Sequence, residues 1–326
     1  MYNCLKGNGL IAFSDPAGAK ACLGLISILK HIHKTGEYTV ISNKEYDFYK
    51  DWDIDISIQT SFNLKLQVDK PDWIFTGTSH PESSGRFELE IIKQAKRLSI
   101  PTWAFIDHWT ALALRFQDRD GFTWPDKIIV LDDHAKALAI EDGISNDLLC
   151  IHSNPYIDYI GQYWKPSLQA SELKESIGIK DRSATVILYA PDPLSLRNEE
   201  EVWGFNEGMV LKELLEILKD IPNVVLLIKT HPLQPKGIME EVNLYSGYHI
   251  PVHFINNINN LELINIADLI IGFYSNFLIE AAALHKKIIR YFPKTGELDP
   301  IKHLVIGERA TSWIQFANLT KNELQK

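Results

Sequence analysis

The strongest constraint on the fold is a repeated alternation of short apolar runs with amphipathic segments. Runs of this length suit strands that are buried on both faces, and the helical segments between them would cover those faces. The pattern predicts an α/β protein built on doubly wound parallel sheets. The predicted strands are Gly9–Phe13, Tyr38–Ile41, Ile54–Ile58, Trp73–Phe75, Thr102–Ile106, Ile128–Leu131, Leu148–Ile151, Thr185–Tyr189, Val224–Ile228, Val252–Ile255, Leu269–Ile271 and His303–Ile306.

The chain is long enough for two such sheets. Its 326 residues exceed the usual size of one domain and suit two. Pro155 and Pro166 bracket an aromatic stretch at which the composition changes, so we place a hinge between residues 154 and 171. The prediction is a Rossmann-like domain at residues 1–160 and a second at 161–310. A terminal helix at 311–326 could pack back onto the first domain.

Charge and cysteine content exclude several classes of function. The 33 Lys and Arg residues against 42 Asp and Glu give a net charge of −9, which disfavours a nucleic-acid partner. Cys4, Cys22 and Cys150 lie far apart, so neither a zinc site nor a disulfide framework is indicated. No uninterrupted apolar run reaches membrane-spanning length. We expect a cytoplasmic protein with no metal, and we leave open its oligomeric state and any peripheral contact with a membrane or an assembly complex.

The stretch from residue 268 to residue 292 predicts a strand, a polar turn, a helix and a second strand. Gly272 lets the chain bend, and Ser275 occupies the N-cap position of the helix. The free N–H groups of such a helix suit a phosphate at the sheet's carboxyl edge. Glu280, one turn deeper, could accept hydrogen bonds from sugar hydroxyls. The alternative is an ordinary N-capped unit that binds nothing.

A second polar turn, "KTHP", follows the strand at residues 224–228. Pro232 ends the strand ladder and biases His231 toward an extended conformation, so the imidazole is aimed out of the strand end. Lys229 stands at the same place. Since parallel strands end at one edge of the sheet, we expect these residues to share that edge with Ser275.

The first half carries its polar groups at strand ends as well. Ser14 and Asp15 follow the first strand ahead of Gly18, where helix N–H groups could approach an anion or a sugar. Asp107 and His108 follow the strand at residues 102–106, which is where an α/β enzyme holds a general base. The alternative is that Asp107 only caps a helix. No GxGxxG motif follows the first strand, which disfavours a tightly bound dinucleotide.

With two Rossmann-like halves, the chain resembles the GT-B superfamily of glycosyltransferases, whose domains face each other across a cleft. "LLCIHSNPYID" looks like the strand with which GT-B chains cross between domains, with Ser153 in place of a glycine. "KTHP" and "ADLIIGFYSNFLIEAAALHKKIIRYF" are similar to motifs of CDP-glycerol glycerophosphotransferases and of bacterial sialyl- and Kdo-transferases. In those families the His-Pro histidine and the serine motif engage the donor's phosphate, which implies His231 and Ser275 here. Asn276 stands where a second Ser or Thr is common.

The acidic motif of sialyltransferases has a false match in this chain. The residues "EDG" at 141–143 match the motif, but this triplet lies at the end of a predicted helix. We therefore exclude the triplet as a catalytic motif. The base position of related enzymes then corresponds to Asp107 or His108. The predicted donor-binding residues are Ser14, Asp15, Lys229, Pro232, Tyr274, Ser275, Asn276 and Glu280, and the predicted catalytic residues are Asp107, His108 and His231.

The resemblance implies a metal-independent glycosyltransferase or a glycerophosphate-type transferase. Its donor would be a CMP-sugar, CDP-glycerol or UDP-sugar bound by the second domain, and its acceptor a glycan or lipid-linked molecule bound by the first. The expected setting is bacterial-type surface polysaccharide or glycoconjugate synthesis, with no cofactor besides the donor. One alternative is a nucleotide-sugar 2-epimerase or hydrolase of the same fold, whose Ser-Gly-Gly and Glu-Glu pattern is absent from "YSNFLIEA". A non-catalytic nucleotide-sugar-binding partner is the other.

Overall fold

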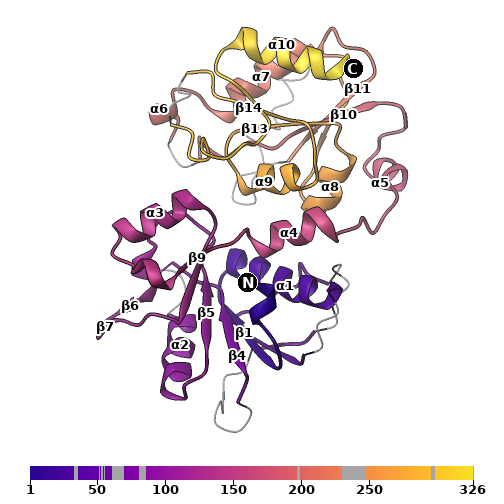
Figure 1. Cartoon of the computed structure of the whole chain (residues 1–326). Helices are drawn as coiled ribbons and strands as arrows, with labels where there is room; N and C mark the ends of the chain where they lie inside the picture. The colour runs from indigo at the N-terminus through magenta and orange to yellow at the C-terminus, as the bar shows by residue number, and fades with distance from the viewer. Residues whose placement is uncertain are drawn as a thin grey trace. The chain divides into compact units, whose positions relative to one another are not determined.

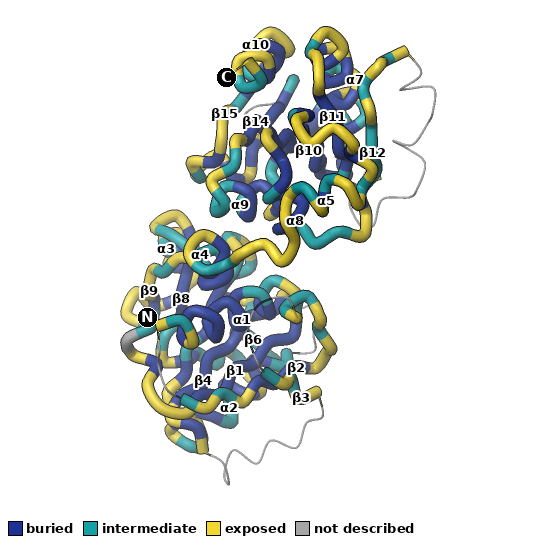
Figure 2. The backbone as a smooth tube through the Cα atoms, turned by 90° about the vertical axis from the view of Figure 1, so that its right-hand side faces the viewer, coloured by how far each residue is buried: buried dark blue, intermediate teal, exposed yellow. Residues whose placement is uncertain are grey.

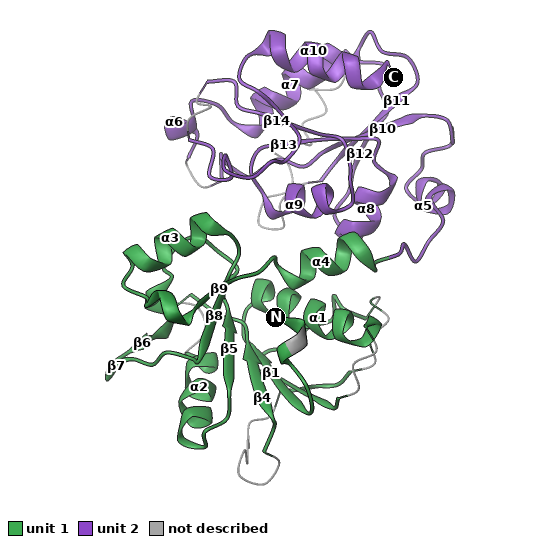
Figure 3. Cartoon of the chain, viewed as in Figure 1, with its two compact units in different colours: residues 1–164 green, residues 165–326 purple. Residues whose placement is uncertain are grey.

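Two parallel β-sheets organise the chain, one in each of two units at residues 1–164 and 165–326 (Figure 1, Figure 3). The structure is a computed structural model. It describes residues 1–32, 36–50, 52, 54, 56–60, 70–80, 86–196, 199–229, 247–294 and 298–325.

Unit 1 contains a sheet of seven parallel strands in the order β3-β2-β1-β4-β5-β8-β9. Chain order runs outward in both directions from the β1–β4 pair, so the carboxyl ends of these strands form a topological switch point. A short antiparallel hairpin, β6-β7, stands apart from the sheet. The elements are η1 (Tyr2–Cys4), β1 (Gly9–Phe13), α1 (Pro16–His31), β2 (Tyr38–Ser42), β3 (Ile58–Gln59), β4 (Trp73–Thr76), α2 (Phe87–Arg97), β5 (Thr102–Phe105), η2 (Ala113–Phe116), β6 (Gln117–Asp118), β7 (Gly121–Phe122), β8 (Lys127–Val130), α3 (Asp133–Glu141), η3 (Asn146–Leu148), β9 (Leu149–Ile151) and α4 (Pro155–Gln162).

Unit 2 repeats this plan with six parallel strands in the order β12-β11-β10-β13-β14-β15. Its switch point lies between β10 and β13. The elements are α5 (Ala170–Ser176), β10 (Thr185–Tyr189), α6 (Glu200–Trp203), α7 (Glu207–Leu218), β11 (Val224–Ile228), β12 (Val252–Phe254), α8 (Asn260–Ile266), β13 (Leu269–Gly272), α9 (Asn276–Ala283), β14 (Ile288–Tyr291), β15 (Glu308–Ala310) and α10 (Trp313–Leu324).

The central strands are apolar throughout because helices cover both faces of each sheet. Every residue of β1, β4, β11 and β13 is buried, and Figure 2 shows dark segments for β1 and β4 in unit 1 and for β11 in unit 2. Burial of large side chains such as Phe13 and Phe75 supplies about 2 kcal/mol each in unit 1. The predicted fold class, two Rossmann-like parallel-sheet domains, is confirmed.

The last predicted strand is wrong in position. Residues 301–304 form turns, and the edge strand β15 lies later, at Glu308–Ala310. Gly307 explains the shift, because its φ of +58° places its Cα against Ile288 and lets the chain enter the sheet beside β14. Val305, in the predicted strand, is fully exposed.

The terminal helix α10 lies in unit 2, where it packs on α7, β14 and β15. The sequence had allowed it to pack back onto the first domain. Within the described ranges, none of the helices has both the length and the apolar character that crossing a bilayer requires.

Two helical glycines offer a matched test of packing. A Cβ on Gly24 of α1 would lie 2.6 Å from the Cα of Tyr156, in the backbone of α4. A Cβ on Gly208 of α7 would meet only the Asn206 side chain, at 3.4 Å. Gly24→Ala should therefore destabilise the protein by about 1–3 kcal/mol, whereas Gly208→Ala should be neutral or stabilise it by up to about 1 kcal/mol.

Urea denaturation of the two variants and the parent chain checks this. Equal free energies of unfolding for Gly24→Ala and Gly208→Ala would contradict the α1–α4 packing described above.

Candidate functional site

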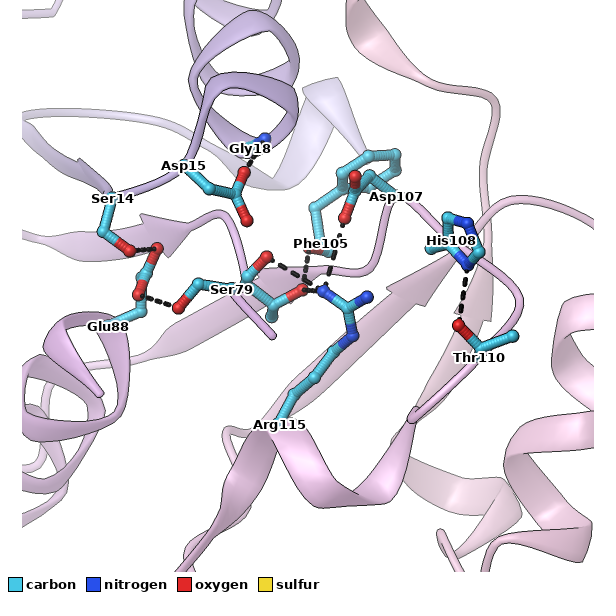
Figure 4. Close-up of polar contacts among 11 residues, drawn as sticks. Ser14, Asp15, Gly18, Ser79, Glu88, Phe105, Asp107, His108, Thr110 and Arg115 are labelled. Atoms are coloured by element: carbon cyan, nitrogen blue, oxygen red, sulfur yellow. Dashed lines mark hydrogen bonds and ion pairs between the residues drawn. The ribbon is translucent and has the colours of Figure 1, made fainter. Parts of the chain in front are cut away.

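In unit 1, three neighbouring strand ends bring a polar cluster together (Figure 4). Ser14 and Asp15 follow β1, Thr78 and Ser79 follow β4, and Asp107 follows β5. Because β1, β4 and β5 are adjacent and parallel, these residues meet at the carboxyl edge of the sheet. We call this cluster the unit 1 edge.

Glu88 is buried at the centre of the unit 1 edge, with 3% of its surface exposed. Its carboxylate accepts hydrogen bonds from the Ser14 hydroxyl at 2.7 Å and from the Ser79 hydroxyl at 3.0 Å. Burial raises the pKa of Glu88, although the two hydroxyl donors oppose that shift. Glu88 thus links α2 to the ends of β1 and β4, and it commits Ser14 to an internal contact.

Sequence reasoning missed Glu88, although a signal was present. Glu88 lies on the same face of α2 as Ile91, Ile92 and Ala95, all of which are buried. A carboxylate on the apolar face of an amphipathic helix needs buried hydrogen-bond donors, which are found at strand ends.

Asp107 is held beside the Arg115 guanidinium. Arg115 Nη1 donates to the Thr78 carbonyl at 3.0 Å and to Thr78 Oγ1 at 3.2 Å, and it lies 3.5 Å from Asp107 Oδ1. Burial raises the pKa of Asp107, and the positive charge of Arg115 opposes that shift. A bend follows Asp107, and the next helical turn has Leu112 at its N-cap, so Asp107 does not cap a helix. Arg115 follows in the same segment of the sequence but is not among the predicted site residues.

Asp15 has a structural role at the unit 1 edge. Its carboxylate caps α1 by accepting from the Gly18 N–H at 2.7 Å. Burial raises the pKa of Asp15, and the negative charge of Asp107 adds to that shift.

His108 lies beside Asp107 but faces outward as an exposed residue. Its Nδ1 shares a hydrogen bond of 2.9 Å with the Thr110 hydroxyl. Partial desolvation lowers the pKa of His108, and the nearby charges of Arg115 and His80 lower it further. The ring is therefore neutral at physiological pH.

In unit 2, the Ser275 turn follows β13 at the carboxyl edge of the second sheet. Ser275 is the N-cap residue of α9, yet its hydroxyl makes no capping hydrogen bond. The Ser275 Oγ atom is buried and has no hydrogen-bond partner in the described part of the chain. By contrast, the N-cap residues Asn206 and Ser312 of the same unit both accept hydrogen bonds from their helices. Among the described residues, the hydrogen-bonding capacity of the Ser275 hydroxyl is therefore unused, beside the open N–H groups at the start of α9.

Other predicted residues of the donor site lie around this turn. Lys229 follows β11, and burial lowers its pKa while the charge of Glu280 opposes that shift. Glu280 is buried in α9 and accepts a hydrogen bond from Asn260 Nδ2 at 3.3 Å. Asn276 is exposed at the first position of α9. The predicted His231 and Pro232 lie outside the described residues.

Tyr274 is tied down at three points. Its N–H donates to Asp192 at 3.1 Å and its hydroxyl to Glu199 at 3.2 Å. Its ring stacks on Trp203 with centroids 5.1 Å apart. The loop between β10 and α7 therefore braces the turn that presents Ser275.

The "EDG" triplet lies where the sequence places it, at the end of a helix. Helix α3 ends at Glu141, and Gly143 follows with a φ of +93°. Across the described residues, no group of three or more His, Cys, Asp or Glu side chains is arranged to hold a metal ion.

A family model described as CDP-Glycerol:Poly(glycerophosphate) glycerophosphotransferase matches residues 144–302. The matched segment runs from the end of unit 1 through most of unit 2, and it includes Lys229, Ser275 and Glu280. The predicted similarity to glycerophosphotransferases in this part of the chain is confirmed. No curated protein matches the chain.

Solved structures similar to this chain cover nearly its whole length. A UDP-GlcNAc 2-epimerase from Methanocaldococcus jannaschii has a TM-score of 0.68 at 14% identity, covering 98% of this chain and 93% of that chain. A putative UDP-N-acetylglucosamine 2-epimerase from Listeria monocytogenes has a TM-score of 0.70 at 13% identity, with 99% and 89% covered. The Anabaena protein HepE, solved with UDP-glucose, has a TM-score of 0.57 at 15% identity, with 96% and 89% covered. At these identities the likeness shows the fold, which is GT-B as predicted.

Because the pKa of Glu88 is raised, the free energy of unfolding should depend on pH. An unfolded chain releases this proton near the ordinary pKa of glutamate, whereas the folded chain retains it to higher pH. The stabilising contribution of the protonated form is therefore present at low pH and lost as pH rises through the folded-state pKa. Glu88→Gln removes this loss, so its stability relative to the parent chain should rise from pH 4 toward pH 8.

Urea denaturation of both chains across this pH range checks the prediction. A difference in unfolding free energy that stays constant with pH would contradict the described environment of Glu88.

Proposed function

We propose that this chain is a metal-independent transferase that moves a glycosyl or glycerophosphate-type group from a nucleotide-activated donor to an acceptor hydroxyl. The observation that carries the proposal is the buried, unpartnered Ser275 hydroxyl at the N-terminus of α9. A phosphate there would receive hydrogen bonds from Ser275 and from the first N–H groups of the helix. The family-model match over this segment supports the coarser conclusion that the chain is a transferase.

The donor side would stabilise the leaving nucleotide. As the bond to the donor phosphate breaks, negative charge builds on the phosphate oxygens. Ser275 and the α9 amides are fixed donors for that charge, and Lys229 lies at the same sheet edge. We assign His231 to this side as well, from its place in the "KTHP" motif. Tyr274, Asn276, Glu280 and Pro232 complete the proposed donor site.

The acceptor side would supply the base. Asp107 would take the proton of the acceptor hydroxyl while that oxygen forms the new bond to the transferred group. Burial raises the pKa of Asp107, which makes its carboxylate a stronger base than an exposed one. Arg115, which is itself held by Thr78, fixes the position of Asp107. His108, neutral and adjacent, is the second candidate for this role.

We further propose the chemical class of the donor and of the acceptor. The family model favours a CDP-glycerol-type donor. CMP-sugars and UDP-sugars also carry a nucleotide phosphate, which the same phosphate-binding site could hold. The acceptor would be a glycan or a lipid-linked molecule in cytoplasmic synthesis of a surface polymer, with contact to a membrane or assembly complex as the natural setting.

The structural neighbours favour a second candidate, a nucleotide-sugar 2-epimerase. Several of them are described as UDP-GlcNAc 2-epimerases with the same fold. Incubation of the purified chain with UDP-GlcNAc and no acceptor separates the two functions. An epimerase would convert the sugar, whereas a strict transferase would leave it unchanged until an acceptor is added.

Ser275→Ala tests the donor site directly. It should weaken binding of a nucleoside diphosphate by about tenfold, the effect of one charge-assisted hydrogen bond. It should cost little stability, because the Ser275 hydroxyl caps nothing. The matched control is Ser312→Ala, which removes a real cap from α10 and should cost about 1 kcal/mol of stability while leaving nucleotide affinity unchanged.

Calorimetric titration with CDP and UDP, together with urea denaturation, measures both effects. Equal nucleotide affinity in Ser275→Ala and the parent chain would count against the proposed phosphate seat.

Asp107→Asn tests the base. Turnover with the donor and acceptor should fall by about a hundredfold or more, while donor affinity stays unchanged. Asp142→Asn is the control, because Asp142 is exposed at the C-cap of α3 and its side chain accepts hydrogen bonds from the backbone N–H groups of Leu112 and Ala113. Steady-state kinetics of both variants decide the point. Full turnover in Asp107→Asn with none in His108→Ala would transfer the role to His108.

A further inference from the structure

One peptide group in unit 2 is held by a charged side chain at each of its two polar atoms. Arg290 Nε donates to the Phe273 carbonyl oxygen at 3.0 Å. Asp192 Oδ2 accepts from the Tyr274 N–H at 3.1 Å. This carbonyl and this N–H belong to the same peptide unit, which joins Phe273 to Tyr274, one residue before Ser275. We refer to it as the 273–274 peptide.

Both charged side chains act from buried positions. Arg290 is 2% exposed and Asp192 is 7% exposed. Hydrogen bonds that involve a charged partner are stronger than neutral ones, and removal from water strengthens them further. Together the two contacts fix the rotation of the peptide plane, because a flip would break both at once.

Arg290 is itself held by a network that extends to the edge of the sheet. Its guanidinium forms an ion pair with Asp299, and Asp299 also lies 3.3 Å from Arg309 Nε. Both guanidinium groups lie over the Phe292 ring, at 5.5 and 5.4 Å from its centroid. Arg290 on β14 is paired in register with Gly272 on β13 and Arg309 on β15. The network therefore holds the Arg290 guanidinium in place against the Phe273 carbonyl, two residues before Ser275.

The opposite end of β13 shows what a purely structural carboxylate does in this sheet. Asp268 Oδ2 accepts from the Val186 N–H at 2.7 Å and so ties the start of β13 to β10. Asp192 makes the same kind of contact at the carboxyl end. The difference is that the peptide held by Asp192 leads into Ser275, whose buried hydroxyl has no partner in the described residues.

We propose that Asp192 and Arg290 are positioning residues for the donor phosphate. By fixing the 273–274 peptide they preset the direction of the Ser275 hydroxyl and of the first N–H groups of α9. Preset donors bind an anion without reorganising, so affinity for the phosphate depends on residues that do not touch it. This inference rests on the proposed function, because it assumes that the Ser275 turn binds phosphate.

The test uses nucleoside diphosphates and their nucleosides as probes of the full chain. Affinities for CDP, UDP, cytidine and uridine are measured by calorimetric titration for Asp192→Ala, Asp192→Asn and Asp268→Ala. Asp192→Ala should weaken diphosphate binding by about tenfold and leave nucleoside binding unchanged, because only the phosphate contacts are misplaced. Asp192→Asn keeps an oxygen acceptor for the Tyr274 N–H and should retain most of the affinity. Asp268→Ala should lower stability without changing the ratio of the two affinities.

Arg290→Met provides an independent arm, with the same selective loss of diphosphate affinity expected. The inference is overturned if Asp192→Ala and Asp268→Ala change the diphosphate-to-nucleoside ratio equally, since both residues would then be structural only. Ser275→Ala separates this failure from failure of the proposed function. If Ser275→Ala leaves diphosphate affinity intact, or if the parent chain binds no diphosphate, then the phosphate seat itself is refuted and the inference falls with it.

Discussion

Burial of both faces of a parallel sheet is the constraint on which this molecule depends. Helices cover the sheet in each unit, so the strands are almost wholly apolar and polar side chains are confined to the strand ends. At the switch point of a doubly wound sheet, the loops that follow two adjacent strands run to opposite faces of the sheet and leave a crevice at the carboxyl ends of those strands. Both polar clusters of this chain lie at such places, one beside β1 and β4 and the other beside β10 and β13.

The two edges present different groups, and the difference suits different tasks. The unit 1 edge gathers the carboxyl groups of Asp15, Glu88 and Asp107 around Arg115, which favours proton acceptance. The unit 2 edge presents the N-terminus of α9, whose open N–H groups favour an anion, and its carboxylates Asp192 and Glu199 bind Tyr274. A transferase needs both a base that accepts the proton of the acceptor and hydrogen-bond donors that stabilise the leaving phosphate.

Features that depend on neighbouring residues, such as strands and helix caps, could be predicted from the sequence. Contacts between residues far apart in the chain could not. Apolar runs located the central strands, and the N-cap position of Ser275 followed from the residues beside it. Glu88, in contrast, meets Ser14 across 74 residues, and Asp192 meets Tyr274 across 82, so no local pattern reveals either contact. The misplaced last strand has a related cause. β15 is a polar edge strand selected by backbone pairing with β14, and hydrophobicity favoured the exposed Val305 segment instead.

The most direct measurement of the central claim is a crystal structure of the full chain with the nucleoside diphosphate that binds it. We expect phosphate oxygens within hydrogen-bond distance of the Ser275 hydroxyl and the first N–H groups of α9. A hollow of about 600 Å³ opens elsewhere in unit 2, beside the amino ends of β10 and β11, and is lined by residues that include Ile179, Pro222 and Pro251. A nucleotide bound in that hollow, with the Ser275 turn unliganded, would contradict the account.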